Sequence, residues 1–304
     1  MRILVTGLRG QVASALAEEG PASGHEIMHL GRPDLDMANP ADPEALIAMA
    51  RPDVIVNAAA YTAVDRAESE PDLAMAINAH AAGRLAVAAA RLDLPLIQLS
   101  TDYVFDGTRA TPYLEADPTG PLGAYGRSKL AGEQAVAASH PRHVILRTAW
   151  VYAHGGTNFV RTMRRLARER PELRVVGDQL GCPTYATDLA RVILAMAGRL
   201  PDSRAGSEAF GIYHAAGAGE TSWAGFARAI VGHRAARGAP APPVVPIPSS
   251  EFPTPARRPA NSRLDCSKLA RIYGIRLPHW EDGLSRCLAR LDEADLATGY
   301  PETP

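Results

Sequence analysis

The chain has 304 residues, of which 46% are hydrophobic and 21% are charged, and its formal net charge at pH 7 is −1. This balance is typical of a globular protein with a full core and excludes an intrinsically disordered chain. The near-zero charge predicts no nucleic acid and no anionic membrane as a partner.

Targeting signals and cysteines point to a reducing compartment. The N-terminal sequence RILVTG shows no basic and apolar leader, and no apolar run approaches the length of a membrane span. Three widely spaced cysteines, Cys182, Cys266 and Cys287, form no CxxC pair, which argues against a disulfide framework or a structural zinc site. We therefore expect a soluble, cytoplasmic protein.

Short apolar runs alternate with helical patterns in the first half of the chain. This alternation indicates a parallel sheet covered by helices on both faces, which is a Rossmann-type doubly wound α/β fold. The apolar runs are 2–7, 25–30, 53–60, 94–100 and 142–148, and the helical patterns are Gln11–Glu19, Pro43–Ala50, Leu73–Leu92 and Tyr125–Ser139.

The pattern changes after about residue 150, where helical segments are separated by loops. The proline-rich stretch 238–259 is predicted to be an extended loop, because proline blocks ladder and helix hydrogen bonds. We predict a Rossmann domain over 1–150, completed by a strand near 211–217, and a smaller, interleaved part over 151–304. The helical segments of that second part lie near 158–170, 186–199, 222–236 and 280–295.

The sequence TGLRGQVASAL follows the first predicted strand and opens the first predicted helix. Its spacing is G-x-x-G-x-x-A, with Gly7, Gly10 and Ala13. The glycines permit a tight turn and let backbone N–H groups approach a pyrophosphate at the helix N-terminus. The first domain is therefore predicted to bind NAD(P).

The end of the second predicted strand indicates which nicotinamide cofactor is used. An acidic residue there would select NAD, but this chain has Gly31 and Arg32 in that place. A guanidinium can pair with the 2′-phosphate of NADP. We therefore predict NADP, with NADPH preferred and NADH possible.

Tyr125 and Lys129, in YGRSKLAGE, are four residues apart and share one face of a predicted helix. Only two of the 32 basic residues are lysines, so this pairing is not expected by chance. An ammonium near a phenol favours phenolate and lowers its pKa, which would let Tyr125 exchange protons near neutrality. A hydroxyl at the end of the fourth strand, from Ser100 or Thr101, would bind and orient a substrate carbonyl.

The chain resembles the extended short-chain dehydrogenases/reductases, and among them the dTDP-4-dehydrorhamnose reductase family. The resemblance covers most of the chain, to about residue 265. The stretches that carry it are GLRGQVA, RPDVIVNAAAYTAVDRAESEP, STDYVFDGT, YGRSKLAGE, RTAWVYAHGGTNFVRTM, GDQLGCPTYATDLA and RRPANSRLD.

The resemblance implies reduction of the 4-keto group of a dTDP-linked 6-deoxyhexose with NAD(P)H, giving dTDP-L-rhamnose. Tyr125 would donate a proton, Lys129 would hold the nicotinamide ribose, and Thr101 would bind the keto oxygen. Asp102 and Trp150 would contact the sugar, and 151–304 would form the substrate-binding part. Besides Gly7 and Arg32, proposed above from the motif and the strand end, the resemblance implies these cofactor positions: Gly10, Gln11, Val12, Asp36, Met37, Ala60, Tyr61, Thr62 and Leu99.

Other readings of the same motifs remain open. A nucleotide-sugar 4-epimerase shares the fold and the Tyr/Lys pair. A non-catalytic NADP-binding regulatory subunit, like the β subunit of methionine adenosyltransferase, resembles the same family. A 4,6-dehydratase is disfavoured because Tyr103 stands where such enzymes have glutamate.

Metal and quaternary structure are less defined by the sequence. Some family members are reported as Mg²⁺-dependent dimers joined through glutamates, but no acidic cluster of this kind can be assigned here, so no metal site is predicted. The expected partner is a dTDP-sugar, with the protein a monomer or homodimer. Arg257 and Arg258 are candidates for contact with the pyrophosphate of the substrate.

Overall fold

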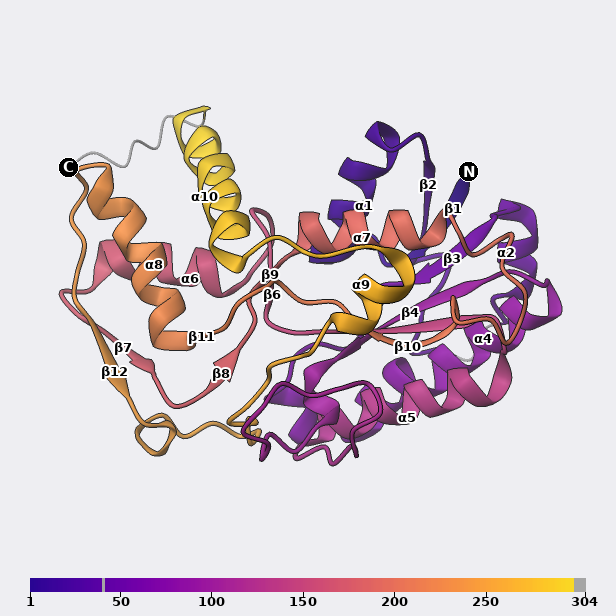
Figure 1. The fold of residues 1–304 in the computed structure, drawn as a ribbon, viewed down its shortest axis with the longest axis horizontal. Coiled ribbons are helices and arrows are strands. Elements are labelled where there is room, and N and C mark those ends of the chain that lie inside the picture. The colour runs from indigo at the N-terminus through magenta and orange to yellow at the C-terminus, as the bar shows by residue number, and fades with distance from the viewer. Residues whose placement is uncertain (40–41, 298–304) are drawn as a thin grey trace.

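A six-stranded parallel sheet is the centre of the fold in the computed structural model, which describes residues 1–39 and 42–297 (Figure 1). The strand order is β10-β5-β4-β3-β1-β2, and every neighbouring pair is parallel. The doubly wound α/β class predicted from the sequence is confirmed. The strands are β1 (Arg2–Thr6), β2 (Glu26–Leu30), β3 (Val54–Asn57), β4 (Leu96–Thr101), β5 (His143–Thr148) and β10 (Gly211–His214).

Helices cover both faces of the sheet because successive strand residues point to opposite sides. Val54 and Val56 are fully buried in a cluster with side chains of α1 and α7, whereas Ile55, between them, is buried with side chains of α2 and α4. The helices of the first face are α1 (Gln11–Ala22) and α7 (Ala186–Ala197), and those of the second are α2 (Glu44–Ala50), α4 (Ala81–Arg91) and α5 (Ala124–Ser139).

Two parts of the sheet layer come from beyond residue 150. Strand β10 pairs with β5 at one edge of the sheet, and α7 packs against α1. The short helix α9 (Ser267–Tyr273) contributes Leu269 to the same core cluster. The chain therefore returns to its first half after building other structure, and the division into domains at about residue 150 stays a prediction.

The stretch predicted as one helix over 73–92 is interrupted. It consists of α3 (Pro71–Met75), a π-helical turn (Ala76–His80) and α4. By length and composition, the 21 residues Pro71–Arg91 would suffice to cross a membrane, with a mean hydropathy of 1.3, which corrects the expectation that no run approaches that length. Half of the stretch is buried, and its alanines pack over the sheet and α5, as in a core helix.

A second cluster of elements lies beside the sheet, where Figure 1 shows α6, α8 and α10 together. Their apolar faces share a core that contains Phe226 and Leu284. The proline-rich stretch predicted as a loop holds a four-residue strand, β12, which pairs with β7 in parallel. The elements are β6 (Val151–Tyr152), α6 (Phe159–Glu169), β7 (Leu173–Val176), β8 (Leu180–Gly181), β9 (Thr184–Tyr185), β11 (Thr221–Ser222), α8 (Trp223–Ala236), β12 (Val244–Ile247) and α10 (Trp280–Ala297).

Candidate active site

The predicted site residues gather at the carboxyl edge of the sheet, where open α/β sheets bind ligands. A ladder of buried polar side chains crosses this edge. The Thr6 hydroxyl donates to Asn57 Oδ1, Asn57 Nδ2 donates to Gln98 Oε1 at 2.7 Å, and Gln98 Nε2 donates to the carbonyl of Leu99 at 2.8 Å. The ladder ties the ends of β1, β3 and β4 together, so that groups on the three strands keep a fixed spacing.

The glycine loop connects β1 to α1 in the way the motif predicts. Gly7 has a φ of +95°, a conformation that residues with a side chain rarely adopt. Gly10 is the N-cap residue of α1, and a Cβ atom there would meet no other atom within 4 Å. The Oε1 atom of Gln11 is buried without a hydrogen-bond partner among the described residues. Open space, free N–H groups and an unused polar atom fit a pyrophosphate at this helix end.

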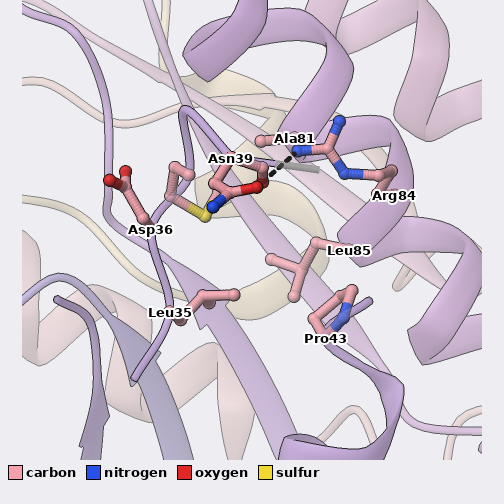
Figure 2. A pocket seen from close by; sticks show the side chains of 8 residues that line it. Leu35, Asp36, Asn39, Pro43, Ala81, Arg84 and Leu85 are labelled. Atoms are coloured by element: carbon pink, nitrogen blue, oxygen red, sulfur yellow. Dashed lines mark hydrogen bonds between the residues drawn. The ribbon is translucent and has the colours of Figure 1, made fainter. Parts of the chain in front are cut away.

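The segment after β2 forms the far end of this site. Arg32 is exposed and makes no hydrogen bond or ion pair with the described part of the chain, so its guanidinium is free to meet an anion. Figure 2 shows Asp36 on one side of a shallow hollow that Ala81, Arg84 and Leu85 of α4 line from the other side. The hollow has a volume of about 10 Å³, which is room for about one water molecule. The lining residues are Leu35, Asp36, Met37, Asn39, Pro43, Ala81, Arg84 and Leu85.

Tyr61, predicted to lie along the cofactor with Ala60 and Thr62, is held by its backbone. Its N–H donates to Asn78 Oδ1 at 2.9 Å, and Asn78 Nδ2 donates back to its carbonyl at 3.0 Å. Asn78 lies in the π-helical turn and also donates to the Ser128 hydroxyl. The widened turn therefore anchors the loop after β3 to the helix that carries Tyr125. Sequence reasoning missed Asn78.

Lys129 points under the end of β4. Its ammonium donates a hydrogen bond to the carbonyl oxygen of Leu99 at 2.7 Å, and the side chain is 4% exposed. Burial lowers the pKa of Lys129 to about 8, although the nearby Glu133 carboxylate acts in the opposite direction. The lysine and the strand end at Leu99, both predicted from the sequence, are therefore in direct contact.

Tyr125 lies in the first turn of α5, against residues of the β4 end. Its ring meets that of Tyr103 edge-to-face, with the ring centroids 5.6 Å apart. Burial and the nearby Asp102 carboxyl raise the pKa of Tyr125 to about 12, while a hydrogen bond with Thr101 acts to lower it. The structure thus brings the predicted tyrosine and threonine together.

The predicted effect of Lys129 on this phenol is not found. The sequence predicts a lowered pKa for Tyr125, whereas the pKa is raised. The reason is geometric, because the ammonium is directed at the carbonyl of Leu99 rather than at the phenol. Burial therefore dominates the acidity of Tyr125.

Thr101 and Asp102 form a polar pair at the point where β4 ends. The Thr101 hydroxyl donates to Asp102 Oδ1 at 3.0 Å and accepts from the backbone N–H of Tyr103 at 3.2 Å. Asp102 is 3% exposed. Burial raises its pKa to about 6, opposed by the hydroxyls of Ser262 and Thr101. The pair presents a hydroxyl and a carboxyl to the same region as the Tyr125 phenol.

A buried ion pair lies directly behind these groups. Glu133, one helical turn beyond Lys129, accepts from Arg147 Nε at 2.9 Å and from Arg147 Nη2 at 2.6 Å, and it also accepts from the Ser100 hydroxyl at 2.5 Å. Glu133 and Arg147 are each at most 3% exposed. Sequence reasoning missed the pair, although the spacing of four from Lys129 places Glu133 on the same helix face.

Trp150 occupies a strained position just beyond β5. Its φ is +49°, in the left-handed region, and its indole stacks on Trp223 with the ring centroids 3.5 Å apart. A Cβ atom on Gly181, in the GCPT stretch, would lie 2.3 Å from the indole of Trp150. The glycine therefore makes room for Trp150, and Trp223, from α8, fixes the plane of its ring. Neither Trp223 nor this role of Gly181 was predicted.

The two candidate pyrophosphate-contacting arginines differ. Arg258 pairs with Asp65, with Nη2 2.8 Å from Oδ2 and Nη1 3.1 Å from Oδ1, so its guanidinium is already engaged. Arg257 is exposed. Within residues 1–39 and 42–297, no group of three or more His, Cys, Asp or Glu side chains is placed to hold a metal ion.

Comparison with known proteins gives one consistent family. The family model described as the RmlD substrate binding domain matches residues 1–293. A Sinorhizobium fredii protein named dTDP-4-dehydrorhamnose reductase is 51% identical over 94% of this chain and 96% of its own length. A Burkholderia thailandensis protein of the same name is 47% identical over 96% of this chain and 99% of its own length.

A solved structure agrees with these relatives. The Bacillus anthracis dTDP-4-dehydrorhamnose reductase, determined in complex with NADP, superposes with a TM-score of 0.87 at 37% identity. The match covers 95% of this chain and 99% of that chain.

Proposed function

The chain belongs to the family described as the RmlD substrate binding domain, and on that premise we propose that it reduces dTDP-4-dehydrorhamnose (dTDP-4-dehydro-6-deoxy-L-mannose) to dTDP-L-rhamnose with NADPH. One observation carries the proposal. The phenol of Tyr125, the hydroxyl of Thr101 and the ammonium of Lys129 meet at the end of β4, on the sheet edge that also bears the glycine loop. The oxidoreductase class follows from relatives that are 42–51% identical and bear the name of this reductase.

The residues of the site fit a dinucleotide. The free N-terminus of α1 suits a pyrophosphate, and the exposed guanidinium of Arg32 suits a 2′-phosphate. Asp36 and Met37, beside a shallow hollow after β2, would lie at the adenosine end of the cofactor. A bound nicotinamide would supply the hydride for the 4-keto carbon.

The chain's own residues would hold the sugar and handle the proton. The Thr101 hydroxyl, which donates to Asp102 in the structure, would instead donate a hydrogen bond to the keto oxygen of the substrate. Tyr125 would give that oxygen its proton. Lys129, which carries a positive charge below its pKa of about 8, would hold the ribose of the nicotinamide beside them. Trp150 would pack on the apolar face of the deoxysugar.

A coupled assay tests the proposal. The purified protein is mixed with dTDP-glucose, a 4,6-dehydratase, a 3,5-epimerase and NADPH, and absorbance at the nicotinamide band is followed. We expect the wild type to consume NADPH and form dTDP-rhamnose. The rate of this reduction should be roughly 10²- to 10⁴-fold lower in the Tyr125→Phe variant. A Tyr125→Phe variant that reduces the ketosugar at the native rate would disprove the role of Tyr125 as proton donor.

The same preparation separates the alternatives. A 4-epimerase retains its cofactor through turnover, so the purified protein would show bound nicotinamide in its absorption spectrum. A regulatory subunit would bind the cofactor but would not consume NADPH in the coupled assay. We extend the proposal to a cytoplasmic protein that is a monomer or a homodimer, which gel filtration with light scattering distinguishes.

A further inference from the structure

The helix that carries Tyr125 begins without a cap from its own N-cap residue. That residue is Gly123, which has no side chain to accept from the free N–H groups of the first turn. Tyr125 is only the second residue of the helix. The position of its phenol therefore depends on what holds the first turn in place.

The carboxylate of Glu68 supplies this cap from a distant part of the chain. Its Oε1 atom accepts a hydrogen bond from the backbone N–H of Ala124 at 2.7 Å, across 56 positions of sequence. A Cβ atom on Gly123 would lie 2.6 Å from the same oxygen, so the glycine leaves the space that the carboxylate fills. A negative charge at a helix N-terminus is also favoured by the helix dipole.

The residues just before Glu68 are held in place by their own contacts. Glu68 ends the 3₁₀ helix Arg66–Glu68, in which Ala67 is fully buried in a small cluster with Ala124 and is contacted by Tyr125. Asp65, just before this turn, forms the ion pair with Arg258. The carboxylate therefore reaches the helix from a fixed support.

We propose that Glu68 is a positioning residue, which holds the first turn of α5 and thereby keeps the Tyr125 phenol aimed at the reacting oxygen. The proposal rests on the reductase function proposed above. The influences on the pKa of Tyr125 are burial, Asp102 and Thr101, and Glu68 is not among them. Its effect on the phenol accordingly passes through α5, which it holds at the Ala124 N–H and, with 3.9 Å between Oε2 and Nη2, at the guanidinium of Arg127.

Substitutions separate the acceptor from the charge. Glu68→Gln keeps an oxygen acceptor at the same reach, whereas Glu68→Ala removes it. We expect Glu68→Ala to lower kcat roughly 10- to 100-fold, since a small misplacement of a reacting group costs that much, with the Kd for NADPH unchanged. Glu68→Gln should restore most of the kcat. Should the alanine variant fail to fold, Glu68→Asp, whose carboxylate is one methylene short of Ala124, takes its place.

A second readout does not depend on turnover. Hydrogen exchange in the first turn of α5 should become faster in Glu68→Ala than in the wild type and return to the wild-type rate in Glu68→Gln. If the wild type reduces no ketosugar, the proposed function fails, and the exchange rates still decide the capping role. Glu169→Gln, which removes one partner of an exposed ion pair on α6, is the matched control and should change neither kcat nor exchange in α5.

Three results would overturn the proposal. They are a native kcat in Glu68→Ala, a loss of kcat in Glu68→Gln as large as that in Glu68→Ala, or unchanged exchange in the first turn of α5 when the carboxylate is removed.

Discussion

The ammonium of Lys129 donates a hydrogen bond to the carbonyl oxygen of Leu99, with 2.7 Å between the two atoms. Gln98 donates to the same carbonyl, so the end of β4 anchors both the polar ladder of the sheet edge and the lysine of the proposed active site. This contact holds the ammonium in a buried place, and the burial lowers its pKa to about 8.

The lowered pKa predicts a pH dependence. Lys129 is charged below about pH 8 and loses its charge as the pH rises through that value. We therefore expect kcat/KM for the ketosugar to fall above about pH 8 in the wild type. The Lys129→Arg variant should have a lower kcat/KM, but this value should not fall near pH 8, because a guanidinium stays charged there. If kcat/KM still falls near pH 8 in this variant, another group is responsible for the titration.

Breaking the buried ion pair behind the site should be costly. Glu133→Gln leaves the charge of Arg147 buried and poorly paired, which typically costs about 3–5 kcal/mol. Urea unfolding of Glu133→Gln, Arg147→Met and the double variant measures this cost and the coupling. We expect the double variant to be less destabilised than the sum of the single variants.

An exposed ion pair on α6 provides the comparison. Arg165 and Glu169 are 2.7 Å apart but largely exposed, and such pairs contribute about 0.5 kcal/mol or less. The same double-variant cycle on this pair should show little coupling. Equal coupling in the two cycles would mean that burial does not set the strength of the Glu133–Arg147 pair.

Local patterns predict most of the helices and strands and propose Tyr125 and Lys129 as a catalytic pair, because these signals lie within a few residues of one another. Apolar runs mark the strands, and the spacing of four between Tyr125 and Lys129 fixes a shared helix face. The sign of the Tyr125 pKa shift could not be read in this way. It depends on burial and on Asp102, which only the folded chain brings together.

Long-range partners explain the other omissions. The contact between Glu68 and Ala124 joins residues 56 positions apart, and no short motif marks it. The π-helical turn that contains Asn78 has an alanine-rich sequence that favours an ordinary helix. The Asn78 side chain forms hydrogen bonds with the backbone of Tyr61 at the position where the helix widens into the π-helical turn. Because Tyr61 is 17 residues away in the sequence, no local pattern predicts these bonds.

Removing Arg32 should reduce the preference for NADPH. If its guanidinium pairs with the 2′-phosphate, Arg32→Ala loses a charge-assisted contact and kcat/KM for NADPH should fall roughly tenfold or more, with NADH unaffected. Arg91→Ala is a suitable control, because Arg91 is an exposed arginine whose partner is Glu44. Parallel losses with both cofactors in Arg32→Ala would contradict a role in cofactor choice.

Adding a single methyl group at Gly181 should disturb the tryptophan stack. The new Cβ atom would lie 2.3 Å from the Trp150 indole, so either the indole or β8 must move. Overpacking of this kind costs about 1–3 kcal/mol. We expect Gly181→Ala to raise the KM for the ketosugar and to change tryptophan fluorescence, because the Trp150–Trp223 stack would separate, while the Kd for NADPH stays unchanged.

The control for this substitution is another glycine changed to alanine. Gly232 lies inside α8, and a Cβ atom there meets nothing within 4 Å. Gly232→Ala should stabilise the protein by up to about 1 kcal/mol through helix propensity and leave the KM unchanged. If Gly181→Ala also left the KM unchanged and did not destabilise the protein, the Trp150 indole would have enough space to accept the added methyl group. The strained backbone of Trp150, at a φ of +49°, would then need a cause other than packing against Gly181 and Trp223.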